Sequence, residues 1–140
     1  YWIHLGGRAL ETFRPMLGKK TFQQILDENP GGCAAELSDT SHFHIDLFGN
    51  YIPGLCSGLA ICNVDLGKRL SEETYPIITA LSNYGIRGLV QMAEDISGFL
   101  PHKEIYLNKC DLCTEVRTFL VLKDYKESCE LNPVEFYIRI

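Results

Sequence analysis

The chain has 140 residues, of which 46% are hydrophobic and 22% are charged. This length suits one domain, and the composition excludes a disordered chain, a collagen helix and a coiled coil. The formal net charge is -5, from 13 basic and 18 acidic residues, which argues against a nucleic-acid partner or an anionic membrane surface. Six cysteines are many for a protein of a reducing compartment, so the function is to be sought among them.

The N-terminal residues have no basic segment followed by an apolar run, so no signal peptide is recognised. No apolar stretch reaches the roughly 18 residues that a membrane span needs. The chain begins at Tyr1 and not at Met, and we expect residues 1–140 to be a single domain cut from the C-terminal part of a longer protein. Closely spaced reduced cysteines suit metal chemistry in a reducing compartment, so we expect a cytoplasmic location.

The first half of the chain carries the clearest β signal. A short strand over residues 2–5 is followed by a helix over 21–28, for which Thr21 is the N-cap. Polar and apolar residues then alternate over 42–47, as on a strand with one buried face. A turn follows, and a second strand over 51–53 completes a hairpin that ends at an edge or strand-terminating proline.

The second half is mostly helical. The expected elements are helices over 71–84, 86–99 and 114–123 and a final strand over 134–140. We therefore predict an α+β fold in which a small antiparallel β-hairpin packs with three to four helices. A metal or cluster site is expected between the hairpin and the Cys-x-x-Cys segment that opens the last helix.

Cys110 and Cys113, separated by two residues, form the most specific local pattern. Two thiolates at this spacing can turn toward one ion or cluster, and zinc and iron–sulfur sites both use it. The N-terminus of the helix that follows favours thiolate over thiol. The same pattern occurs in thioredoxin-type redox dithiols and as pairs of buried thiols. Four further cysteines in the chain favour a metal.

A tetrahedral sulfur site needs two more ligands. Cys33 precedes the predicted hairpin and Cys56 follows it, and a hairpin returns its two ends close together. The expected ligand set is Cys33, Cys56, Cys110 and Cys113. Cys62 lies in an apolar run and is interpreted as a core thiol, whereas Cys129 lies in a polar stretch and is a fifth ligand or a spare thiol.

The segment from Cys33 to Cys56 resembles the C-terminal auxiliary-cluster region of radical SAM enzymes, of the SPASM and Twitch type. In that family a first cysteine is followed by a strand, an Asp-x-x-Gly-Asn turn, which corresponds to residues 46–50, a second strand ending in proline, and another cysteine. A later Cys-x-x-Cys, matched by Cys110 and Cys113, supplies further ligands. The resemblance covers about residues 33–117.

The resemblance implies an auxiliary 4Fe-4S cluster held by the four cysteines of the expected ligand set. It further implies a role in electron transfer or substrate positioning. The partner would be an N-terminal radical SAM barrel of the same protein, which binds S-adenosylmethionine.

Two departures from the family pattern matter. Residues 50–55 separate the turn glycine Gly49 from Cys56, whereas the family has four residues there. The full pattern continues after its Cys-x-x-Cys with two closely spaced cysteines, but here only Cys129 follows, so one cluster is expected. The Cys-x-x-x-Cys-x-x-Cys motif that binds the catalytic cluster is absent from the sequence. We therefore do not expect these residues to be catalytic by themselves.

Other candidates have simpler explanations. His42 and His44 share a face of the predicted strand and are secondary ligand candidates with Cys129, although exposed or hydrogen-bonded histidines are commoner there. Asp46 is expected to cap its own turn. The arginines Arg8, Arg87 and Arg117 could bind a carboxylate, but ordinary surface charge is the usual explanation.

Two other classes of protein stay open. A structural or interaction module could fold around zinc with the same four thiolates, because both zinc and iron–sulfur clusters accept four cysteines. An isolated fragment could also carry zinc, or nothing, in a site meant for a cluster. The third class is an extracellular domain with three disulfides.

Overall fold

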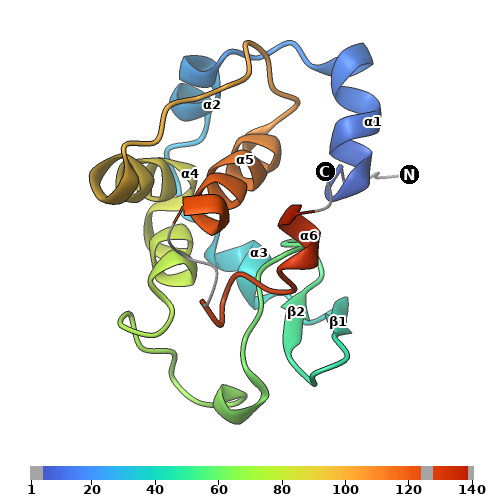
Figure 1. Cartoon of the computed structure of the whole chain (residues 1–140), viewed down its shortest axis with the longest axis vertical. Coiled ribbons are helices and arrows are strands. Elements are labelled where there is room, and N and C mark those ends of the chain that lie inside the picture. The colour runs from blue at the N-terminus through green and yellow to red at the C-terminus, as the bar shows by residue number, and fades with distance from the viewer. Residues whose placement is uncertain (1–4, 124–127, 139–140) are drawn as a thin grey trace.

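Two helices, α4 (Pro76–Ser97) and α5 (Lys109–Lys123), pack against each other at the centre of the fold (Figure 1). The computed structural model describes residues 5–123 and 128–138. The core consists mainly of apolar side chains from these two helices and the loops beside them, among them Tyr75, Leu81, Ile86, Leu89, Tyr106, Leu112, Val116 and Leu120. Burial of this apolar surface is the main favourable term that holds the two helices together.

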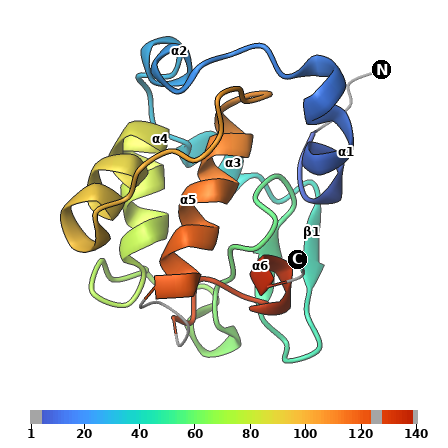
Figure 2. The same cartoon turned by 45° about the horizontal axis from the view of Figure 1, so that its top comes forward.

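The other elements surround α5. They are α1 (Arg8–Leu17), α2 (Phe22–Glu28), α3 (Ala34–Ser38), β1 (Phe43–Ile45), β2 (Tyr51–Pro53), the 3₁₀ helix η1 (Asn63–Asp65) and α6 (Glu135–Ile138). In Figure 2, α2 and α4 lie on one side of α5, and α1, the hairpin and α6 lie on the other. The strands pair antiparallel, with Phe43 opposite Pro53. The predicted α+β class, with a small antiparallel hairpin among helices, is confirmed.

Local signals of the sequence are confirmed at two places. Thr21 caps α2 with a capping box, in which its hydroxyl accepts from the N–H of Gln24 at 3.2 Å and its own N–H donates to the Gln24 side chain at 2.8 Å. The second strand spans the predicted residues and ends at Pro53. The predicted buried face of the first strand is wrong, because Phe43 and Ile45 are 50% and 54% exposed.

The helix predicted over 71–84 begins later, at Pro76. Ser71 instead caps a turn, in which its hydroxyl accepts from the N–H of Thr74 at 3.2 Å. The helices predicted over 71–84 and 86–99 are joined into α4, with a kink at Gly85 (φ 63°, ψ -147°). The helix predicted over 114–123 begins earlier, at Lys109.

The strand predicted over 134–140 is wrong, because residues Glu135–Ile138 form the helix α6. Its backbone closes helical turns, such as the bond from the N–H of Tyr137 to the carbonyl of Val134 at 2.9 Å. Neither α1 nor α3 was predicted. The strand predicted over 2–5 falls mainly outside the described residues.

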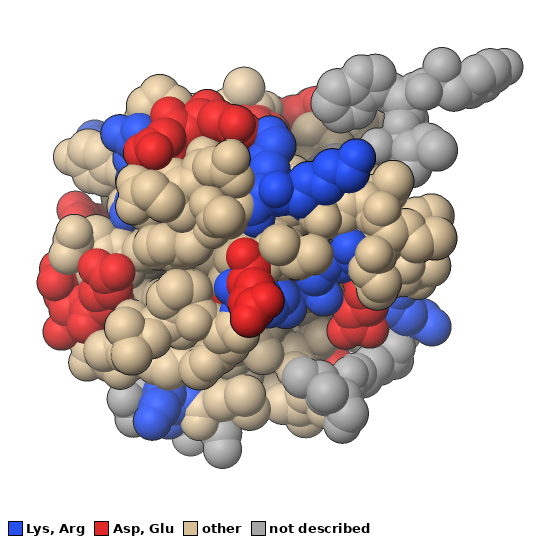
Figure 3. All heavy atoms as spheres, turned by 90° about the horizontal axis from the view of Figure 1, so that it is seen from above, with Lys and Arg blue, Asp and Glu red and all other residues tan. Residues whose placement is uncertain are grey.

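Within residues 5–123 and 128–138, no helix combines the length and apolarity that a bilayer crossing requires. Charge on the face seen in Figure 3 is mixed, since Lys and Arg side chains lie beside Asp and Glu side chains. A partly buried ion pair also joins the guanidinium of Arg14 on α1 to the carboxylate of Asp111 on α5, with Nε donating to Oδ2 at 2.7 Å. This ion pair fastens α1 to the central helix.

Candidate functional site

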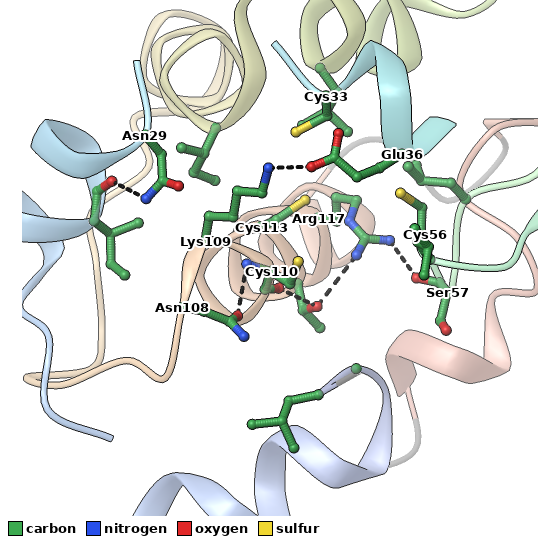
Figure 4. A pocket seen from close by; sticks show the side chains of 18 of the residues that line it. Asn29, Cys33, Glu36, Cys56, Ser57, Asn108, Lys109, Cys110, Cys113 and Arg117 are labelled. Carbon is green, nitrogen blue, oxygen red and sulfur yellow. Dashed lines mark hydrogen bonds and ion pairs between the residues drawn. The ribbon is translucent and has the colours of Figure 1, made fainter. Parts of the chain in front are cut away.

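A cavity of about 610 Å³ lies between α5, α3 and the loop after β2. Its walls include all four cysteines of the expected ligand set, namely Cys33, Cys56, Cys110 and Cys113 (Figure 4). These residues come from three separate stretches of the sequence. The structure therefore brings the four thiols together around one space, although their role as ligands stays a prediction.

Cys33 reaches the cavity because its loop packs tightly against the kink of α4. Its N–H donates to the carbonyl of Leu81 at 2.8 Å. A side chain on Gly32 would put a Cβ atom 2.2 Å from the carbonyl oxygen of Ser82, and one on Gly85 would lie 2.1 Å from the carbonyl oxygen of Gly31. Glycine is needed at both positions for this close approach, which fixes Cys33 at the start of α3.

The Cys-x-x-Cys pair lies in the first turns of α5. The side chain of Asn108 accepts from the N–H groups of Cys110 at 3.0 Å and Asp111 at 3.1 Å, which is an N-cap arrangement. Cys113 follows one turn later on the same face. Cys56 is placed by a tight turn after β2, in which its N–H donates to the carbonyl of Pro53 at 3.1 Å.

An ion pair links two of these elements. The ammonium of Lys109, at the start of α5, lies 2.6 Å from a carboxylate oxygen of Glu36 on α3 (Figure 4). Both residues line the cavity beside Cys33 and Cys110. Burial is the largest single effect and works to raise the pKa of Glu36, but the hydrogen bond and charge of Lys109 and a backbone hydrogen bond together outweigh it, and the pKa is lowered. The pair holds α3 and α5 in the arrangement that keeps their cysteines together.

Arg117 is the most unusual residue of the cavity, because its guanidinium is buried, with 4% of the residue exposed. It donates to the carbonyl of Ser57 at 2.8 Å, to the hydroxyl of Tyr137 at 2.7 Å and to the hydroxyl of Thr114 at 3.3 Å. These acceptors are all uncharged. Within the described part of the chain its Nε atom has no hydrogen-bond partner, and no carboxylate forms an ion pair with it.

The thiols and Arg117 influence one another. Burial, reinforced by the neighbouring Cys113 and opposed by Arg117, raises the pKa of Cys56 to about 12 and that of Cys110 to about 11. Burial opposes the charge of Arg117, but Tyr137 and Cys113 outweigh it and its pKa is raised. Burial thus favours the neutral thiol at Cys33, Cys56 and Cys110, which lie around a buried cation.

The other sequence candidates lie elsewhere. Neither His42 nor His44 lines the cavity, and both are exposed, with ring centroids 4.7 Å apart. Cys129 and Cys62 are also outside it, and Cys62 is half-buried and not the core thiol that was predicted. Asp46 caps its own turn as expected, accepting from the N–H groups of Phe48 and Asn50 at 2.8 and 2.9 Å.

Sequence reasoning missed the charged residues of the site. Arg117 was a candidate for binding a carboxylate, but the preferred explanation, ordinary surface charge, is wrong because the residue is buried. Lys109 and Glu36 were not candidates. One local signal could have found Arg117, because it stands four residues after Cys113 and therefore on the same face of a helix. No comparable signal exists for Glu36, whose approach to Lys109 depends on the tertiary fold.

The cavity fits a group larger than one ion. Its volume of about 610 Å³ is many times the roughly 30 Å³ occupied by a water molecule. Among the residues with described positions, no group of three or more His, Cys, Asp or Glu side chains is arranged to hold a single metal ion.

Comparisons with models of known protein families, with curated proteins and with solved structures returned no match.

Proposed function

We propose that this chain is an auxiliary 4Fe-4S cluster-binding region of a radical SAM enzyme, with Cys33, Cys56, Cys110 and Cys113 as the ligands. The cluster would serve electron transfer or substrate positioning. The proposed partner is an N-terminal radical SAM barrel in the same cytoplasmic protein, which would bind S-adenosylmethionine. The motif resemblance suggests this class, and the shared cavity supports the ligand set.

The observation that carries the proposal is the burial of Arg117 among thiols. A buried cation without an anionic partner costs several kcal/mol, so buried charges are normally paired. Cys113 and Cys56 are among the groups that act on the guanidinium, and cysteines become anions when they bind metal. Thiolate ligands around a cluster would supply the negative charge that Arg117 lacks.

Each wall residue then has a defined task. The four cysteines supply the sulfur ligands, and the ion pair between Lys109 and Glu36 holds two of their elements together. Arg117 and Lys109 place positive charge beside the thiolates. The apolar part of the wall, which includes Ile25, Leu37, Leu59 and Ile86, excludes water. Iron–sulfur chemistry depends on these same features, since charge, hydrogen bonds and solvent exposure set the reduction potential.

Anaerobic reconstitution of the chain with iron and sulfide tests the proposal. We expect a brown protein with acid-labile sulfide and about four irons per chain, as a 4Fe-4S cluster requires. Cys56→Ser should lose most of the iron and sulfide. Cys62→Ser is the matched control, because its thiol lies outside the cavity, and it should load like the unmodified chain.

Two outcomes would overturn the proposal. One is a chain that takes up no acid-labile sulfide under anaerobic conditions while it remains folded by circular dichroism. The other is a colourless protein that binds one zinc ion per chain through the same cysteines and excludes iron. That second result would identify the zinc-binding structural module with a four-cysteine site.

A further inference from the structure

The two cysteines outside the cavity, Cys62 and Cys129, belong to chain segments that run side by side. The N–H of Ala60 donates to the carbonyl of Glu130 at 2.9 Å. This bond joins the segment before η1 to the segment that leads into α6. Cys62 and Cys129 flank this contact although 66 residues separate them in the sequence.

Both cysteines are attached to the same short turn. The N–H of Cys62 donates to the hydroxyl of Tyr75 at 3.1 Å, and the thiol of Cys129 donates to the carbonyl of Thr74 at 3.8 Å. Tyr75 in turn donates to a carboxylate oxygen of Asp65 at 2.6 Å. These contacts anchor the backbone of Cys62 to the side chain of Tyr75 and the sulfur of Cys129 to Thr74, which precedes Tyr75 in the sequence.

The backbone bond between Ala60 and Glu130 places the two cysteines on neighbouring segments, and Cys62 influences the thiol of Cys129. Burial raises the pKa of Cys129, and the charge and hydrogen bond of Cys62 raise it further. Both residues are half-buried and neither forms a disulfide. A small reagent can therefore reach a pair of thiols that the fold already holds together.

We propose that Cys62 and Cys129 form a dithiol modification site that a low-molecular-weight disulfide converts to a disulfide bond. The thiolate of one cysteine attacks the small disulfide, forms a mixed disulfide and releases one thiol. The thiolate of the other then attacks the protein sulfur of that mixed disulfide and releases the second thiol. The protein loses two hydrogen atoms and two small thiols are formed, so atoms and electrons balance.

The bond would join the loop between β2 and α4 to the segment that carries Glu130 and Tyr137. That segment supports the cavity, because Tyr137 accepts a hydrogen bond from Arg117. A disulfide between Cys62 and Cys129 would therefore limit the movement of the segment that supports Arg117, although neither cysteine lines the cavity. This inference does not rest on the proposed cluster, since none of the four cavity cysteines takes part.

Oxidised glutathione is the probe for this site. The full chain is incubated anaerobically with it, remaining thiols are alkylated, and the digest is mapped by mass spectrometry. We expect a cross-linked peptide that contains Cys62 and Cys129, and a higher unfolding temperature because a long loop is closed. A reductant should reverse both changes.

Cys62→Ser and Cys129→Ser are matched controls. In each, the remaining cysteine should stop at a mixed disulfide with glutathione, and the rise in unfolding temperature should be lost. The proposal is overturned if both cysteines stay open to alkylation in excess oxidised glutathione. It is equally overturned if either forms its cross-link with a cavity cysteine, and both results can be read whether or not the chain binds a cluster.

Discussion

The cysteines of this protein form two groups with opposite surroundings. The four cavity cysteines lie around Arg117 and Lys109, on walls built from α3, α5 and the turn after β2. The groups that act on Cys129 are a thiol, a phenol and the carboxylate of Glu130, and no lysine or arginine of the described residues is among them. Cations beside the four cavity cysteines would favour their thiolates as metal ligands. Cys62 and Cys129 suit disulfide formation for a different reason, because they are half-buried on neighbouring segments.

The largest expected difference between the two groups concerns stability. Loading the cavity should raise the free energy of unfolding by about 5 kcal/mol, because metal sites that join separate elements contribute folding energy directly. Cys113→Ser should abolish this increase, whereas Cys129→Ser should keep it. Anaerobic denaturant unfolding of loaded and unloaded chains measures both. An equal loss in the two variants would show that the groups are not distinct.

A second prediction concerns the carboxylate of Glu130, next to Cys129. It is fully buried, and its two oxygens accept from the N–H groups of Ile77 and Ile78 at 2.9 Å each. Burial raises its pKa to about 7 from an ordinary value of 4.5. The protonated form is thus favoured by folding, and the associated stability is fully present below pH 4.5 and lost as the pH rises through about 7.

This loss amounts to about 3 kcal/mol at 1.36 kcal/mol per pKa unit. Glu130→Gln should remove it, so the difference in unfolding free energy between the unmodified chain and the variant should change between pH 4.5 and pH 7. Exposed Glu135→Gln is the control and should leave the pH profile unchanged. A difference that stays flat with pH would show that Glu130 is ionised throughout, held by the helix N-terminus alone.

A third prediction separates the groups by reactivity. Arg117 lowers the pKa of Cys56 and Cys110 against the larger effect of burial. Arg117→Gln should therefore slow the alkylation of these two thiols at pH 9 by roughly threefold, since the thiolate is the reacting form. Cys62 and Cys129 in the same digest should react at unchanged rates. Faster alkylation of the cavity thiols would mean that Arg117 mainly closes the cavity to solvent.

The sequence predicted the parts of the site that depend on local patterns. The Cys-x-x-Cys pair and the hairpin between Cys33 and Cys56 could be predicted from the sequence, because residues that are close in the chain determine both. The short apolar alternation around Phe136 is ambiguous between a strand and a helix, and there the prediction was wrong. The start of α5 was missed because Asn108, six residues before the predicted start at residue 114, acts as its cap.

The charges of the cavity could not be predicted in the same way. Arginine is rarely buried, so surface charge was the preferred explanation for Arg117, whereas the fold buries it in hydrogen-bonded contact with Tyr137 and Ser57. The contact between Cys62 and Cys129 was missed for a related reason. It depends on a backbone bond between Ala60 and Glu130, and no sequence pattern links two such distant loops.

The smallest expected effect belongs to the ion pair between Lys109 and Glu36. Its side chains are 27% and 33% exposed, so solvent screens the pair and Glu36→Gln should cost only about 0.5 kcal/mol of stability. The exchange Glu36→Lys with Lys109→Glu should restore most of that loss, and high salt should reduce it.

The more exposed pair of Lys20 and Glu28 is the matched control, because it also lines the cavity but joins α2 only to the residues before it, which carry no cavity cysteine. Lys20→Gln should change stability less than Glu36→Gln and should leave iron uptake unchanged. Glu36→Gln should slow iron uptake, because α3 would then hold Cys33 less firmly against α5. If uptake is as fast in Glu36→Gln as in Lys20→Gln, the glycine contacts of the loop before α3 are sufficient to position Cys33, and the ion pair contributes only ordinary surface stability.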